Sequence, residues 1–379
     1  MNAPEPWPIS VVTPRRAGPL LSVIVPTFNE KANVEELLKR LDDALKGILW
    51  EAVFVDDDSP DETAEFVRSI SRIDARVRCV QRLGRRGLSS ACVEGILATS
   101  APYVAVMDAD LQHDEHILPE MLRHLQDEDL DIVIGSRYVQ GGSVGVWQQD
   151  RAAMSRFATR LSRLVVNADL KDPMSGFFML RRDVFMKASR RLSSLGFKIL
   201  LDIFASSPDP LRLREVPFEF RTRYAGESKL DSVAMWDFGM LLLDKLVGHI
   251  VPVRFVMFSM VGVLGLGVHL VALGTMLSIA HLTFGAAQMT ATIVAMTGNF
   301  LLNNYMTYRD KRLKGIGLLT GLLTFYAACG LGALANVGAA SYVFEHDYSW
   351  WVSGIAGVAI GAVWNYAATS LLTWRNIPK

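Results

Sequence analysis

Short apolar stretches alternate with amphipathic ones over the first half of the chain. Five stretches have the β-branched composition of buried strands: Leu21–Val25, Ala52–Val55, Arg76–Val80, Tyr103–Met107 and Ile132–Ile134. After the first strand, apolar residues recur at helical spacing from Val34 to Leu41, and Asn29 is expected to cap this helix. A second helical stretch begins at Asp61. Strands that alternate with helices predict an α/β domain with a doubly wound, mostly parallel sheet.

The second half of the chain is far more apolar and contains four long spans. They lie near Arg254–Ile279, Phe284–Tyr308, Gly315–Phe344 and Trp350–Trp374. Each approaches the ~20 residues that cross a bilayer, so we predict an all-α transmembrane domain of four helices. The alternative, four buried helices of a soluble protein, is disfavoured because spans this long and apolar rarely occur together in water-soluble chains.

Basic residues between the spans predict their orientation. The second connection and the chain end are basic, with Arg309, Lys311, Arg312, Lys314, Arg375 and Lys379. The first and third connections contain no Lys or Arg. By the positive-inside rule both termini and the second connection are cytoplasmic.

Composition sets the domain boundaries. Residues 1–19 contain five prolines and no apolar core of a signal peptide, so we expect a flexible leader and a cytoplasmic catalytic domain. The α/β domain then covers 20–230, an interfacial amphipathic helix 231–252 and the transmembrane domain 253–379. A further amphipathic stretch, Phe157–Val165, either lies at the lipid interface or covers the sheet.

Charge and cysteine content exclude several classes of protein. Lys plus Arg equals Asp plus Glu at 39 each, which gives no reason to expect nucleic acid as a partner. The three cysteines have no C-x-x-C spacing, which favours a reducing compartment and argues against a disulfide framework or a zinc site. The sequence also lacks a P-loop, a dinucleotide fingerprint and a G-x-S-x-G elbow.

The segment after the fourth predicted strand has the clearest chemistry. In an extended chain, Asp108, Asp110 and Gln112 project to one side and offer three oxygen ligands. Oxygen ligands suit Mg²⁺ or Mn²⁺. The alternative is a solvated acidic loop. A second acidic strand end at Asp56–Asp58 favours the metal site, since ligands bind beyond the carboxyl ends of such strands. His113 follows directly, and we expect it to be solvated.

Several motifs together resemble a known family. Val23–Glu30, Val55–Asp61 and Asp108–His113 resemble a family 2 glycosyltransferase with a GT-A fold. More narrowly, Gly135–Tyr138, Asp172–Phe178 and Gly226–Lys229 are similar to dolichyl- or polyprenyl-phosphate mannose synthases. The apolar spans, with Gly298–Phe300 and Asn303–Tyr305, resemble a GtrA-type four-helix membrane domain.

The resemblance implies a role for each matching residue. The residues that would bind the nucleotide-sugar are Pro26, Phe28, Glu30, Asp57, Arg85 and Asp108. Among them, Asp57 would recognise the base. Asp108, Asp110 and Gln112 would hold the metal, with Asp110 closest to the sugar. The catalytic set would be Asp110, Arg137, Arg223 and Lys229, and the lipid phosphate would be held by Arg137, Arg151 and Ser155. Arg85 departs from the family pattern, which more often has Lys at this position.

These roles lead to one main hypothesis and two alternatives. We expect transfer of mannose from GDP-mannose to a polyprenyl phosphate at the membrane, with inversion and release of GDP. A general base is unnecessary because the acceptor phosphate is already an anion. One alternative uses UDP-glucose as donor, and another makes the membrane domain a flippase or binding protein for lipid-linked sugar. A polymerising synthase is disfavoured, because the sequence has no Q-x-x-R-W segment.

Overall fold

The computed structural model describes residues 18–143, 168–193, 198–221, 232–248, 250–346 and 349–375. The chain forms two compact units, Met1–Leu246 and Val247–Lys379. Each unit is described by itself below.

The first unit is built on one seven-stranded sheet, in the order β3-β2-β1-β4-β6-β5-β7. The strands are β1 Leu21–Thr27, β2 Trp50–Asp56, β3 Val77–Gln81, β4 Tyr103–Val106, β5 Ile132–Ser136, β6 Phe178–Arg181 and β7 Leu213–Pro217. All pairs are parallel except those of β6, which runs antiparallel to β4 and β5. The five predicted strands are present, whereas β6 and β7 were not expected. The sheet is therefore mixed.

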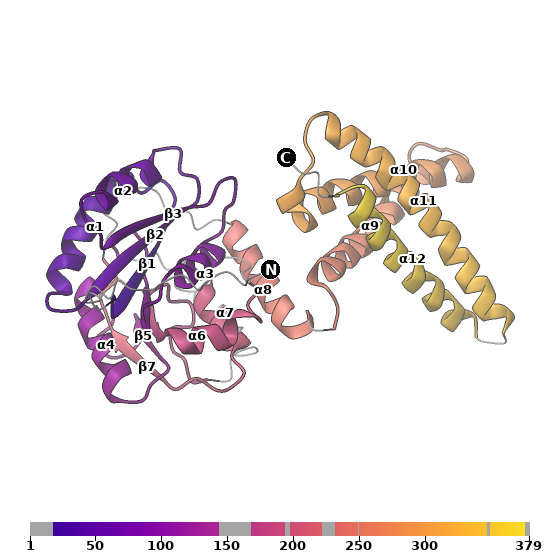
Figure 1. The fold of residues 1–379 in the computed structure, drawn as a ribbon. Coiled ribbons are helices and arrows are strands. Elements are labelled where there is room, and N and C mark those ends of the chain that lie inside the picture. Colours follow the sequence, from indigo (N-terminus) through magenta and orange to yellow (C-terminus); the bar gives the residue numbers. More distant parts are fainter. Residues whose placement is uncertain are drawn as a thin grey trace, which may run out of the picture. The chain divides into compact units, whose positions relative to one another are not determined.

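Helices cover both faces of this sheet (Figure 1). One face packs against α1 Lys31–Ala44, α2 Thr63–Ser71 and α4 Leu118–Asp127, and the other against α3 Leu88–Ala98, α6 Arg182–Ser189 and α7 Ile199–Ser206. Strand alternation assigns the side chains, since Val23 and Val25 belong to the first core and Ile24 to the second. Gly95 of α3 is required by close packing, because a Cβ there would lie 2.4 Å from Ile24 Cγ2.

The start of α1 differs from the prediction. The helix begins at Lys31, with Glu30 at the N-cap and no side-chain capping bond. Asn29 has a left-handed φ of 58°, and its N–H donates to Ser59 Oγ at 3.0 Å. The Lys31 N–H donates instead to Asp61 Oδ2 at 3.1 Å. Asn29 makes the turn from strand to helix, because Asn tolerates φ > 0, and the neighbouring loop supplies the acceptor.

The 3₁₀ turn η1 Glu115–Ile117 leads into α4, and α8 Ser232–Val247 follows β7. Leu241 and Leu242 of α8 pack on Leu201 of α7. Lys245 Nζ lies 2.6 Å from the buried carboxylate of Asp202. The C-terminal part of α8 therefore covers the α/β unit.

The second unit contains four long helices: α9 Val253–Ser278, α10 Phe284–Leu302, α11 Ile316–Glu345 and α12 Trp350–Leu372. Helix α9 packs on α10, and α11 packs on α12. Within the described residues, α9 and the Ile316–Asn336 part of α11 are long and apolar enough to cross a membrane. The count of four spans stays a prediction.

A π-helical turn, η2 Asn303–Thr307, and a 3₁₀ turn, η3 Arg309–Lys311, connect α10 to α11. Asn304 Oδ1 accepts the Leu313 N–H at 2.8 Å and the indole N–H of Trp374 at 3.1 Å, while its Nδ2 donates to the Leu313 carbonyl at 3.2 Å. Trp374 is fully buried and stacks on Tyr308, with ring centroids 4.1 Å apart. Asn304 thus links the α10–α11 connection to Trp374, which follows α12, by hydrogen bonds.

Candidate active site

The carboxyl ends of β1, β2, β4 and β5 lie along one edge of the sheet, and each leads into a polar loop. Asp56, at the end of β2, is fully buried and accepts hydrogen bonds from Thr27 Oγ1 at 3.1 Å and from the Ser59 N–H at 2.9 Å. Its carboxylate joins the ends of β1 and β2. Asp56 therefore stabilises this edge of the sheet by linking β1 to the loop that follows β2.

Asp57 is the next residue and faces the loop after β3. Its Oδ1 accepts from Arg82 Nη1 at 2.7 Å, and its Oδ2 accepts from the Gly87 N–H at 2.7 Å. Burial raises the pKa of the Asp57 carboxyl, while the Gly87 N–H and the Arg82 guanidinium act in the opposite direction. The resemblance assigned base recognition to Asp57, and here its carboxylate also shapes the loop from Arg82 to Gly87.

The other residues predicted for the nucleotide lie on both sides of Asp57. Pro26 is inside β1, and Phe28 and Glu30 follow its end. The guanidinium of Arg86 lies 4.2 Å from the centre of the Phe28 ring. Arg85 is 60% exposed and pairs with Glu94 at 2.6 Å. Sequence reasoning missed Arg82 and Arg86. Arg82 directly follows β3, and its position at a strand end was the available signal.

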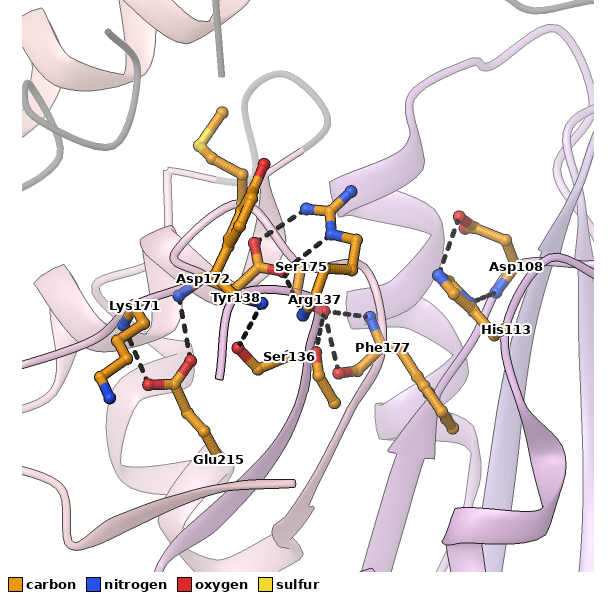
Figure 2. Close-up of polar contacts among 12 residues, drawn as sticks. Asp108, His113, Ser136, Arg137, Tyr138, Lys171, Asp172, Ser175, Phe177 and Glu215 are labelled. Carbon is orange, nitrogen blue, oxygen red and sulfur yellow. Dashed lines mark hydrogen bonds and ion pairs between the residues drawn. The ribbon is translucent and has the colours of Figure 1, made fainter. Parts of the chain in front are cut away.

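Asp108 lies in the loop after β4, two residues beyond the strand, and His113 lies against it (Figure 2). The Asp108 N–H donates to His113 Nδ1 at 3.1 Å, and His113 Nε2 lies 3.8 Å from Asp108 Oδ2. His113 stacks on Phe177 at 5.0 Å. Burial lowers the pKa of His113 to about 4, so the imidazole is neutral at pH 7. The expectation of a solvated His113 was wrong, because three phenylalanines enclose its ring.

Asp110 and Gln112 lie in a turn rather than in the extended segment expected from the sequence. Leu111 between them has a left-handed φ of 63°, and the Gln112 N–H donates to Asp110 Oδ1 at 3.2 Å. Asp110 is buried, whereas the side chain of Asp108 is 38% exposed. Gln112 Nε2 donates to the Arg221 carbonyl at 2.9 Å, which orients its amide. The loop is therefore held from two sides.

Arg221 also neutralises the acidic residues that follow the loop. Its guanidinium contacts Asp114 at 2.7 Å and Glu115 at 2.9 Å. Ligand atoms of Asp114, Glu115 and His116 lie within 4.8 Å of one another. Because Arg221 already pairs with both carboxylates, we assign this cluster a structural role.

Arg137 leaves the end of β5 and forms a two-point ion pair with Asp172 (Figure 2). Arg137 Nε and Nη2 each donate to one carboxylate oxygen of Asp172 at 2.8 Å. Asp172 is fully buried, and its own N–H donates to Glu215 Oε1 at 3.0 Å. The pair is thus a buried, oriented contact, and its geometry is the one that Arg prefers with carboxylates.

The loop from Asp172 to Phe177 brings the Arg137 pair close to the acidic loop. Ser175 Oγ donates to the Gly135 carbonyl at 2.7 Å, which ties the loop to β5. A methyl group built on Gly176 would lie 3.4 Å from Asp108 Oδ2, so this glycine borders the Asp108 carboxylate. The structure therefore brings together Asp108, Arg137 and Asp172 around one loop. Arg151, Ser155, Arg223 and Lys229 lie outside the described residues.

Comparison with known proteins identifies the family of the chain. A model described as glycosyl transferase family 2 matches residues 22–188, and one described as the GtrA/DPMS transmembrane domain matches 257–374. The dolichol-phosphate mannosyltransferase of Pyrococcus furiosus is 35% identical over 360 residues, covering 94% of this chain and 99% of that protein. The chain belongs to glycosyl transferase family 2.

Two further similarities are less extensive. The dolichol-phosphate mannosyltransferase of Saccharomyces cerevisiae is 37% identical over 220 residues, which cover 55% of this chain and 80% of that protein. The solved structure of glucosyl-3-phosphoglycerate synthase from Mycobacterium tuberculosis is 20% identical, with a TM-score of 0.43, and the match covers 61% of this chain and 80% of that one. The predicted family and the predicted glycosyltransferase activity are confirmed by the match along 94% of the chain. The chain is a membrane enzyme with a GT-A-like domain and a GtrA-type domain.

Proposed function

We propose that this enzyme transfers mannose from GDP-mannose to a polyprenyl phosphate of the dolichyl type and releases GDP. The supporting observation is the 35% identity with a dolichol-phosphate mannosyltransferase along 94% of the chain, which spans both the α/β domain and the helical domain. A lipid acceptor fits a catalytic domain that is fused to a membrane domain. The residues to which we assign roles in binding lie in the loops at the ends of β1, β2, β4 and β5.

Asp108, Asp110 and Gln112 fit a Mg²⁺ or Mn²⁺ ion by their donor chemistry. Two carboxylates and one amide are hard oxygen ligands, and the contact from Gln112 Nε2 to Arg221 leaves the amide oxygen as the ligand-type atom of that side chain. His113 and the Asp110 contact to the Gln112 N–H fix the loop. When bound, the metal would stabilise negative charge on the leaving diphosphate.

The residues around the metal ligands bind and orient two anions. An oxygen of the lipid phosphate attacks the anomeric carbon of mannose, and the bond from that carbon to the diphosphate breaks on the opposite side. One negative charge passes from the acceptor phosphate to GDP, so no proton has to be removed. Single displacement inverts the anomeric centre. Arg137, held by Asp172, would orient phosphate oxygens, and Phe28, Glu30, Asp57 and Arg85 would border the nucleotide.

The decisive experiment compares donors with purified full-length protein. Reactions with Mn²⁺ and polyprenyl phosphate receive labelled GDP-mannose or labelled UDP-glucose, and the lipid phase is extracted. We expect lipid-linked label from GDP-mannose, and none from Asp110→Asn protein that still inserts in membranes. If label enters the lipid phase only from UDP-glucose, the donor is UDP-glucose and not GDP-mannose. Activity of the Asp110→Asn variant would overturn the metal-binding role of Asp110.

The polyprenyl-phosphate glucosyltransferase remains the second candidate, because it uses the same acceptor chemistry. A flippase or binding function of the helical domain is a separate hypothesis. It is tested by measuring movement of the lipid-linked sugar across vesicles that contain the inactive Asp110→Asn protein.

A further inference from the structure

Lys198 is a cation close to the proposed site that none of the roles above uses. It directly precedes α7, and its Nζ donates to the Met174 carbonyl at 3.0 Å. The first residues of α7, Ile199 and Leu200, are buried in the core of the sheet. The backbone that carries the lysine is therefore fixed, while its four-carbon side chain keeps the reach to change partners.

The loop that contains Met174 connects Lys198 to both parts of the site. Asp172, two residues earlier, pairs with Arg137, and Gly176, two residues later, borders the Asp108 carboxylate. Figure 2 shows the Arg137 pair on one side of Phe177 and Asp108 with His113 on the other. Lys198 thus contacts the centre of a short loop that carries Asp172 near one end and borders the Asp108 carboxylate near the other.

The charges around Lys198 favour an anionic ligand. Burial lowers the pKa of its ammonium group to about 8, the Arg137 charge lowers it as well, and Asp172 and Asp108 act in the opposite direction. The group remains largely protonated at pH 7. Both carboxylate oxygens of Asp172 already accept hydrogen bonds from Arg137. The charge of Arg137 therefore acts on Lys198, and a phosphate bound by both cations would reduce the repulsion between them.

We propose that Lys198 binds the phosphate of the lipid acceptor together with Arg137. This assignment rests on the proposed function. The acceptor is favoured over the donor because Lys198 and Arg137 border the loop of Asp172 next to β5, whereas the metal ligands follow β4. Lys198 stays protonated throughout and donates hydrogen bonds, so it adds no bond-breaking step to the transfer.

Two substitutions separate the charge of Lys198 from its contact with Met174. Lys198→Gln keeps a hydrogen-bond donor for the Met174 carbonyl but carries no charge, and Lys198→Arg keeps the charge. Binding of farnesyl phosphate and of GDP with Mn²⁺ is measured by calorimetry on the detergent-purified full chain. We expect Lys198→Gln to weaken farnesyl phosphate binding roughly tenfold to a hundredfold, the range of one lost charged hydrogen bond, with GDP binding unchanged. Lys198→Arg is expected to restore most of the loss.

Lys245→Gln is the matched control, because Lys245 is also an enclosed lysine but its Nζ pairs with Asp202 of α7 rather than with the Met174 loop. It should lower the unfolding temperature and leave farnesyl phosphate binding unchanged. Wild-type affinity in Lys198→Gln, an equal loss in Lys245→Gln, or a loss confined to GDP would each overturn the proposal. If the wild type binds farnesyl phosphate through Lys198 but transfers no mannose, the proposed function fails and the phosphate site stands.

Discussion

The imidazole of His113 accepts the backbone N–H of Asp108 at Nδ1, at 3.1 Å, and its Nε2 lies 3.8 Å from Asp108 Oδ2. The first contact requires an unprotonated Nδ1, so the proton of the neutral ring is on Nε2, facing the carboxylate. Ring stacking on Phe177 fixes the plane of the imidazole. His113 therefore orients a carboxylate that we propose as a metal ligand.

Replacing His113 by Phe is expected to weaken Mn²⁺ binding by roughly tenfold to a hundredfold, the usual cost of losing a group that orients a metal ligand. Phe keeps the ring stacking and removes both nitrogen contacts. Mn²⁺ affinity is measured by electron paramagnetic resonance in the presence of GDP. His116→Phe serves as the control, since the His116 side chain is 63% exposed. Unchanged Mn²⁺ affinity in the His113 variant would argue against this orienting role.

The buried pair of Arg137 and Asp172 gives a prediction about stability. Asp172→Asn leaves the Arg137 guanidinium without its charge partner, and we expect a loss of about 3–5 kcal/mol in the free energy of unfolding. Chemical unfolding of the full chain, followed by tryptophan fluorescence, measures this loss. The exposed Asp209→Asn should have no such effect. A double variant, Arg137→Met with Asp172→Leu, should be more stable than Asp172→Asn, and a further loss would contradict the ion-pair argument.

The pH dependence of acceptor binding follows from the pKa of Lys198. Its ammonium group is charged below about 8 and loses its proton above, so wild-type affinity for farnesyl phosphate should fall as the pH rises through about 8. The acceptor phosphate itself is fully ionised there, because its second pKa is about 6. The charged groups that act on Lys198 are Arg137, Asp172 and Asp108. Calorimetric titrations at several pH values test this, and Lys198→Arg should remove the decline. If the affinity of Lys198→Arg for farnesyl phosphate still falls as the pH rises, a group other than Lys198 causes the pH dependence.

Asn304 provides a prediction for the helical unit. Asn304→Ala removes the acceptor for two N–H groups, those of Leu313 and Trp374, and one donor to the Leu313 carbonyl. We expect a loss on the order of 3 kcal/mol, because buried donors would be left without partners. Asn304→Asp keeps the accepting oxygen and should lose less. Thermal unfolding in detergent measures both, and equal losses in the two variants would contradict the role of Oδ1.

The sequence by itself determined the features that depend on local order. Short β-branched apolar runs predicted five of the seven strands, and the position of Asp108–Gln112 after one of them predicts a metal site at that strand end. The long apolar runs of the second half predicted the four helices, because a run of this length and apolar composition is typical of a helix. Family motifs added roles that no spacing rule could supply.

Only the tertiary structure decided which side chains meet. The antiparallel β6 inserts between β4 and β5, and it brings Asp172 to Arg137, 35 residues away in the sequence. Gln112 meets the carbonyl of Arg221 across 109 residues, and the ring of His113 is enclosed by Phe177, Phe218 and Phe220. Such contacts depend on strand order and loop paths rather than on local periodicity. For this reason, the sequence located the acidic motif, whereas the fold supplied the groups that hold it and placed Lys198 against the loop of Met174.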